Sequence, residues 1–154
     1  MGNSDFIFPK KIRFECINCG VCCGDTKEKN RRILMLSEET AEISVKNGIK
    51  ISDFSNICSD KKPYHYEMNK KQNGKCFFLS SKNKCNIYLE RPLICRFYPF
   101  ELIDQSDGNH KFYYTDECPG INKGKTLDKK YFTGLFEQAK NRFQFYFMNI
   151  NNRI

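Results

Sequence analysis

The sequence predicts a small, irregular α+β domain that ends in one long helix. The chain has 154 residues, about the size of one domain, and 40% of them are hydrophobic, including 14 Phe and 8 Tyr. Short apolar runs separated by turn residues predict strands, whereas the C-terminal part has a helical apolar period. We therefore expect a single domain over 1–154, with a cysteine-rich region at 12–120 and a packing helix at 126–150.

Two strands and a helix are expected in the first third of the chain. Residues 12–14 are apolar enough for a short strand, and 33–36 form an apolar run that is typical of a buried strand. Ser37 stands before two glutamates, so its hydroxyl is expected to cap a helix that runs to about Lys46. Gly48 is a suitable stop for that helix.

Two hairpins are expected in the middle of the chain. The first joins 64–68 to 76–79 across Asn73-Gly74, a dipeptide that favours positive φ. The second joins 100–103 to 111–115 across an Asp-Gly-Asn turn.

Two further helices are expected, one short and one long. Proline is tolerated in the first turn of a helix, so Pro92 predicts a short helical turn that holds Cys95. Thr126 is expected to cap the long helix, over 127–149. Its apolar stripe is the strongest periodic signal in the chain and predicts a core-facing helix: Leu127, Tyr131, Leu135, Ala139, Phe143 and Phe147, widened by Phe132 and Phe136.

The chain is basic, and its sequence shows no secretory or membrane-spanning signal. The 26 Lys and Arg exceed the 18 Asp and Glu, for a formal charge of +8. The N-terminus lacks the pattern of a secretory signal, and no apolar run approaches the length of a membrane span. We expect a cytoplasmic protein without a membrane partner. In a reducing cytosol, clustered cysteines indicate metal ligands or redox groups rather than structural disulfides.

The nine cysteines carry the chemistry. Cys16, Cys19 and Cys22 share the Cys-x2-Cys-x2-Cys spacing with which bacterial ferredoxins hold a [4Fe–4S] cluster, although zinc also binds such pairs. Adjacent side chains usually diverge, so the pair Cys22-Cys23 favours two neighbouring sites. With Cys58 left over as dispensable, we expect two sets of four ligands: Cys16, Cys19, Cys22 and Cys118 in one, and Cys23, Cys76, Cys85 and Cys95 in the other.

The joint order of these motifs resembles the cysteine-cluster (YkgJ-like, CxxCxxCC) family of zinc- or iron-chelating proteins. The resemblance covers residues 12–120 and rests on these motifs: Cys16-x2-Cys19-x2-Cys22-Cys23, Cys76-Phe-Phe-Leu, Cys85-Asn-Ile-Tyr, Arg91-Pro-x2-Cys95-Arg-Phe-Tyr-Pro-Phe and Cys118. The family implies metal binding with no general reaction. Flagellin lysine methylases carry a similar cysteine pattern inside a longer chain.

Side chains beside the cysteines are candidates for supporting roles. Arg96, and less so Arg91, flank Cys95 and could donate to thiolates, which makes Arg96 a predicted cofactor-binding residue. Asp25 is expected to be a turn residue rather than an oxygen ligand. The two histidines, His65 and His110, are expected on strand surfaces, although a Cys3His zinc site could recruit one.

These observations predict a metal-binding protein that holds a [4Fe–4S] cluster, zinc or both. Its role would lie in redox chemistry, metal handling or maturation of another protein, with a redox or metal-acceptor protein as partner. Two alternatives stay open: an enzyme of the methyl-transfer or redox type, and a zinc-stapled RNA-binding module. Nucleic-acid binding is the less favoured reading because the lysines are scattered and mixed with Asn and Asp.

Overall fold

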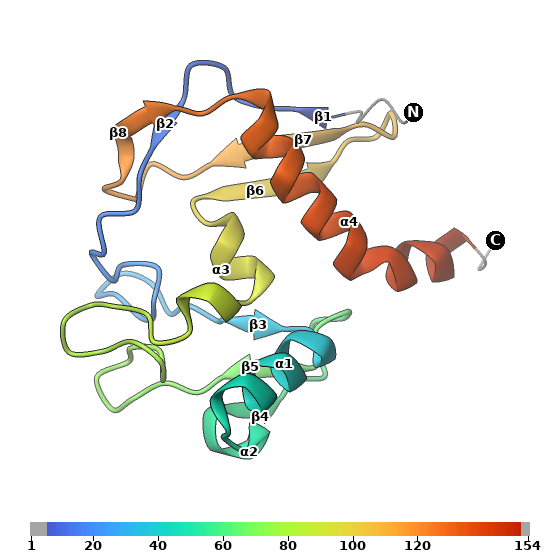
Figure 1. Cartoon of the computed structure of the whole chain (residues 1–154). Coiled ribbons are helices and arrows are strands. Elements are labelled where there is room, and N and C mark those ends of the chain that lie inside the picture. Colours follow the sequence, from blue (N-terminus) through green and yellow to red (C-terminus); the bar gives the residue numbers. More distant parts are fainter. Residues whose placement is uncertain (1–5, 152–154) are drawn as a thin grey trace. The chain divides into compact units, whose positions relative to one another are not determined.

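A computed structural model describes residues 6–151, with side chains as far as Phe143 (Figure 1). It mixes short strands with helices, as the predicted α+β class requires. The chain divides into two compact units: unit 1 is Met1–Ile17 with Phe97–Ile154, and unit 2 is Asn18–Arg96. The single domain over 1–154 stays a prediction. Within the described residues, no helix is long and apolar enough to cross a membrane.

Unit 1 contains a three-stranded sheet in the order β1-β7-β6, made of β1 (Phe6–Ile7), β7 (His110–Tyr114) and β6 (Phe100–Asp104). Strands β6 and β7 pair antiparallel, from Phe100↔Tyr114 to Asp104↔His110, which confirms the second predicted hairpin. Gly108 has φ +83° in the connecting turn, a conformation that glycine adopts without strain. A second pair, β2 (Arg13–Phe14) with β8 (Ile121–Thr126), is also antiparallel.

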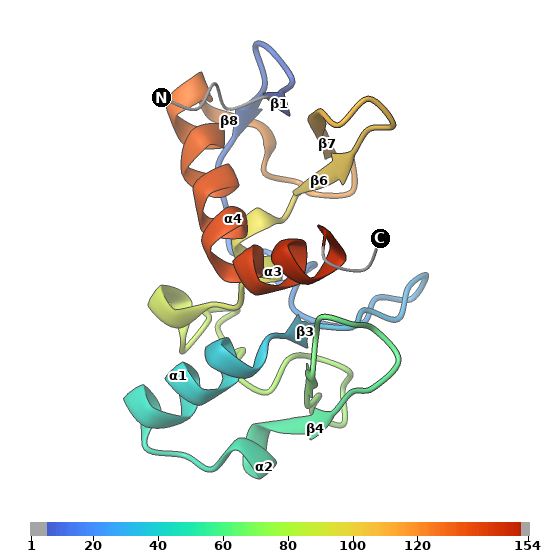
Figure 2. The same ribbon diagram turned by 90° about the vertical axis from the view of Figure 1, so that its right-hand side faces the viewer.

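Helix α4 (Lys129–Asn151) packs on the three-stranded sheet of unit 1 (Figure 2). Phe132 is fully buried, and its ring centre lies 5.1 Å from the ring centres of both Phe100 and Phe112. The predicted apolar stripe is therefore confirmed as a packing face, although Phe147 lies outside the described side chains. The predicted cap was wrong: Asp128, not Thr126, accepts the Tyr131 N–H, because Thr126 still belongs to β8.

Unit 2 contains a second three-stranded sheet in the order β3-β5-β4: β3 (Leu34–Met35), β5 (Tyr66–Met68) and β4 (Ser55–Ile57). Helices α1 (Ser37–Asn47) and α2 (Ile51–Phe54) lie between β3 and β4 in the chain. Helix α1 ends at Gly48 with φ +63°, as predicted. Its start differs, because the Glu39 carboxylate rather than the Ser37 hydroxyl accepts the first free N–H, that of Leu36.

The first predicted hairpin forms only at its turn. Lys71 N–H donates to Lys75 O at 2.8 Å across the Asn73-Gly74 turn, and Lys70 pairs with Cys76 in an isolated bridge. Strand β5, however, pairs with β3 and β4 and not with 76–79. The apolar run 76–79 is instead largely buried in the core of unit 2. It is followed by a 3-10 turn, η1 (Tyr88–Glu90), and by α3 (Leu93–Phe97), the predicted helical turn that holds Cys95.

Candidate metal centre

The hydrophobic core of unit 2 gathers most of its cysteines. Cys76 is a buried member of this core, beside residues such as Phe54 and Phe78. Three more cysteines are partly buried against it, namely Cys23, Cys85 and Cys95. The loops that carry them come from three separate parts of the sequence.

The loop that carries Cys22 and Cys23 is docked onto the segment that carries Cys76. Cys76 N–H donates to Cys23 O at 2.7 Å, and Asp25 N–H donates to Gly74 O at 2.9 Å. Between these bonds Gly24 faces Lys75 in an antiparallel bridge, with φ +136°. A Cβ at Gly24 would stand 2.4 Å from Gly74 O, so only glycine permits this approach.

Asp25 makes side-chain contacts that fix the loop carrying Cys22 and Cys23. Its carboxylate accepts the Arg31 N–H at 2.8 Å and pairs with the Lys70 ammonium at 2.7 Å. The hydrogen bond from Lys70, followed by that from Arg31, holds the Asp25 pKa below its usual value. Asp25 thus closes the loop through its side chain, and the expectation that it is not a metal ligand stays a prediction.

Glu39 fixes the helical turn that carries Cys95. Besides the Leu36 N–H, its buried carboxylate accepts the Leu93 N–H at 2.5 Å, at the start of α3. Two backbone donors from separate elements thus share one side chain, which ties α1 to α3. Hydrogen bonds to a charged acceptor are stronger than neutral ones, so this anchor holds Cys95 in a defined place.

Four thiols of unit 2 lie close enough together to influence one another. Burial raises the pKa of Cys76, Cys85 and Cys95, and charge repulsion adds to it. For Cys95 the repelling thiols are Cys76, Cys22 and Cys85. The pKa of Cys22 is raised first by its hydrogen bond with Cys23 and then by burial. Such a group resists ionisation on its own, and a bound cation would reverse that preference.

The thiols lie near one another, but their sulfur atoms do not have the arrangement of a metal coordination sphere. The Cys22 and Cys23 sulfur atoms lie 3.8 Å apart in a thiol–thiol contact. None of the nine cysteines, all of which are described, forms a disulfide. Among the described residues, no three Cys, His, Asp or Glu side chains stand ready to hold a metal ion. Rotation about χ1 relocates each sulfur, so the backbone placement defines the candidate site.

The two arginines beside Cys95 have different surroundings. Arg96 donates from Nε to Arg91 O and from Nη2 to Leu89 O, both at 2.8 Å, and so ties η1 to α3. Its predicted contact with a cofactor stays a prediction. Arg91 lowers the pKa of the Cys85 and Cys95 thiols, against the stronger effect of burial. Of the two arginines, Arg91 is therefore the one that influences the candidate ligand thiols.

Cys16 and Cys118 belong to unit 1, unlike the other seven cysteines. They lie beyond the same end of the β2 and β8 pair, where Glu15 N–H donates to Gly120 O at 3.1 Å. Cys19 is exposed in unit 2. The first predicted set, Cys16, Cys19, Cys22 and Cys118, thus has members in both units and stays a prediction.

Cys58 has a setting of its own, on the β3-β5-β4 side of unit 2. Its buried thiol donates to Asp60 Oδ1 at 3.1 Å, and Arg32 Nη2 lies 3.5 Å from its sulfur. Arg32 also pairs with Asp60 and Glu67, each at 2.9 Å. Cys58 is therefore part of a polar network, and its dispensability for metal binding stays a prediction.

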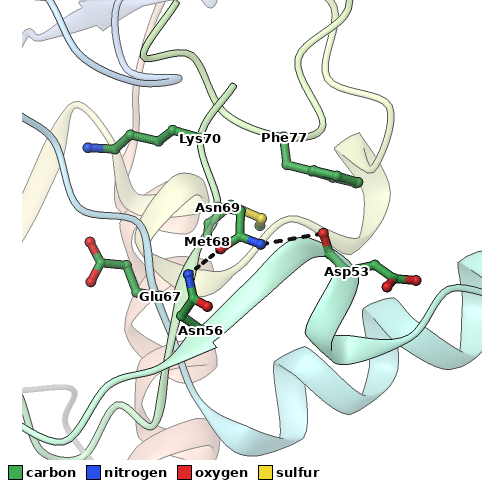
Figure 3. A pocket seen from close by; sticks show the side chains of 7 residues that line it. All are labelled: Asp53, Asn56, Glu67, Met68, Asn69, Lys70 and Phe77. Carbon is green, nitrogen blue, oxygen red and sulfur yellow. Dashed lines mark hydrogen bonds between the residues drawn. The ribbon is translucent and has the colours of Figure 1, made fainter. Parts of the chain in front are cut away.

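A shallow depression borders the segment of Cys76 (Figure 3). Its volume is about 640 Å³, and its lining includes Asp53, Asn56, Glu67, Asn69, Lys70 and Phe77. Asn56 donates to Asn69 at 2.6 Å, and Asn69 donates to the Asp53 carbonyl at 3.4 Å. No cysteine lines this depression, so it is separate from the gathered thiols.

The residues of unit 2 fit a bound metal ion. Soft thiols are the donors that zinc and iron–sulfur centres prefer. Among the described residues, Arg91 Nε is buried with no hydrogen-bond partner, and an unmet buried donor costs about 1–3 kcal/mol. A bound metal ion would use the thiols as ligands, and the resulting thiolates would offer Arg91 Nε an acceptor. The fold and the site thus define the class as a cysteine-rich, metal-chelating domain.

Comparison with known proteins agrees with this class. Residues 15–119 match the CxxCxxCC family, described as "Putative zinc- or iron-chelating domain", and the chain belongs to that family. Two similar relatives are uncharacterized proteins of Methanocaldococcus jannaschii. MJ0939 is 30% identical over 139 residues, covering 85% of this chain and 45% of the relative. MJ0661 is 31% identical over 105 residues, covering 62% and 50%.

The chain therefore spans about half the length of these curated relatives. No solved structure matches it.

Proposed function

We propose that the protein binds one zinc or iron centre through four thiolates of unit 2: Cys22, Cys76, Cys85 and Cys95. The set expected from the sequence has Cys23 in place of Cys22, and it stays a prediction. The observation that carries this proposal is geometric: Cys76 is buried in the core of unit 2, Cys85 and Cys95 pack against that core, and the bond from Cys76 N–H to Cys23 O docks the Cys22 loop on it. Four thiolates meet the ligand demand of tetrahedral zinc or of a [4Fe–4S] cluster. The family description agrees with the chemistry.

The chain's own residues prepare this site before any metal arrives. The Gly24 bridge brings the Cys22 loop onto the Cys76 segment, and Glu39 anchors the turn of Cys95. Partial burial raises the pKa of these thiols, so a cation must take the place of their protons when it binds. When bound, zinc would stabilise the fold, whereas an iron–sulfur cluster would add electron transfer.

The sequence-based expectation of a redox, metal-handling or maturation role belongs to this proposal. A redox or metal-acceptor protein is the partner that such a centre would serve. The metal itself decides between electron transfer and a structural or carrier role, so metal identity is the first measurement to make.

Metal content after anaerobic purification tests the proposal. We expect about one zinc per chain in a colourless protein, or a brown protein with broad visible absorbance and about four iron and four sulfide per chain. Either result supports the proposed centre and names its metal. A folded protein without zinc or iron, which takes up neither after reduction, would contradict it.

A further inference from the structure

Arg91 lies between two of the proposed ligands in the chain, Cys85 and Cys95. Its guanidinium carbon lies 3.7 Å from the centre of the Tyr88 ring, a cation–π contact from the preceding 3-10 turn. Its carbonyl accepts the Nε–H of Arg96, and Pro92 follows it in the chain. The side chain is therefore stacked on one side, and its backbone is fixed on the other.

One hydrogen-bond donor of Arg91, its Nε–H, is unused inside the protein. Nε is buried and has no hydrogen-bond partner among the described residues. A buried guanidinium N–H is a strong donor that is normally satisfied. The side chain also acts on Cys85 and Cys95, whose negative forms it favours. A sulfur atom of Cys85 or Cys95 could accept the hydrogen bond that Arg91 Nε–H has to donate.

A metal-bound thiolate is the acceptor that Arg91 lacks. A zinc ion with four thiolates carries about −2, and hydrogen bonds to ligand sulfurs are the usual way in which proteins stabilise such a charge. A neutral thiol is a much poorer acceptor. Arg91 Nε–H would therefore have a good acceptor when metal is bound and a poor one when the site is metal-free.

We propose that Arg91 is a positioning residue of the metal site, donating its Nε–H to the metal-bound sulfur of Cys85 or Cys95. This inference rests on the proposed function and adds a specific role to it. Arg91 would raise metal affinity while adding little to the stability of the metal-free fold, because the cost of its unmet donor there offsets its contact with the Tyr88 ring. The Tyr88 ring would hold the guanidinium at the angle that this bond needs.

Zinc affinity of the full chain, reduced and stripped of metal, tests the role by competition with a chromophoric chelator. Arg91→Met keeps the apolar stem and removes the donor and the charge. We expect its zinc affinity to fall about 10-fold to 100-fold, the usual effect of losing an outer-shell partner. Arg91→Lys restores charge without Nε–H and should recover part of the loss. The matched control, Lys84→Met, removes an exposed charge next to Cys85 and should change the affinity less than two-fold.

Two further readouts separate positioning from a structural role. The unfolding temperature of metal-free Arg91→Met should equal or exceed that of the wild type, because an unmet donor has been removed. In the Co²⁺-loaded protein, the thiolate-to-metal band should shift to longer wavelength when the hydrogen bond is lost.

The outcomes distinguish this inference from the proposed function. If the wild type and Lys84→Met bind zinc and Arg91→Met binds it within two-fold of them, only the Arg91 role is overturned. The role also falls if Arg91→Met loses affinity together with metal-free stability, or if Lys84→Met loses as much. If the wild type itself takes up neither zinc, Co²⁺ nor iron, the proposed function and the Arg91 role fail together.

Discussion

Replacing Cys95 with serine is expected to lower zinc affinity by more than about 100-fold. Cys95 packs against the core that contains Cys76, and charge repulsion from Cys76, Cys22 and Cys85 adds to burial in raising its pKa. A serine hydroxyl does not ionise near neutral pH and is a hard donor, so it cannot replace a thiolate toward zinc. Competition with a chelator of known zinc affinity measures the loss.

Cys58→Ser is the matched control for Cys95→Ser. Cys58 is also buried in unit 2, but its thiol donates to Asp60, and a serine hydroxyl can make the same bond. We expect wild-type zinc affinity and stoichiometry in this variant. Equal losses in both variants would place the binding site elsewhere or show a general loss of folding.

Replacing Gly24 with alanine should have the second largest effect. The new Cβ would stand 2.4 Å from Gly74 O and 2.6 Å from Lys75 Cα, and the backbone at φ +136° is unsuitable for a side chain. Strain of this kind and steric overlap together cost about 3 kcal/mol or more. Since the bridge to Lys75 places Cys22 beside Cys76, zinc affinity should fall with the urea midpoint.

Gly48→Ala provides the comparison for Gly24→Ala. Gly48 also has positive φ, at +63°, but a Cβ there meets nothing within 4 Å. We expect a cost of about 1–2 kcal/mol from the backbone alone, with zinc affinity unchanged. Wild-type zinc binding by Gly24→Ala would show that the docked loop is not required for the site.

Local sequence signals predicted the elements whose partners lie close in the chain. The β6 and β7 hairpin follows from a Gly-containing turn between two apolar runs, and α4 follows from its apolar stripe. Strand β5 could not be paired correctly, because its partner β3 lies some thirty residues upstream and leaves no local signal. Both helix caps are local contacts across three residues, made by Glu39 and Asp128 rather than by the predicted Ser37 and Thr126.

The cysteines were recognisable from their number and spacing, and their predicted grouping into two sets of four stays a prediction. Which thiols converge depends on the docking of the Gly24 loop and on the anchoring of α3, and both are tertiary contacts. The glycine directly after Cys22-Cys23 was the available signal for a close backbone approach. Arg91 and Arg96 looked alike in sequence, and only the Tyr88 stack and the Arg96 bonds to carbonyls distinguish them.

Four residues, Cys22, Cys76, Cys85 and Cys95, are proposed to hold the metal. Alkylation of the folded full chain, with and without zinc, followed by mass mapping of each cysteine, tests this proposal most directly. We predict that zinc slows the modification of these four residues at least ten-fold and leaves the rate at Cys58 unchanged. Equal rates at the four cysteines with and without bound zinc would contradict the account.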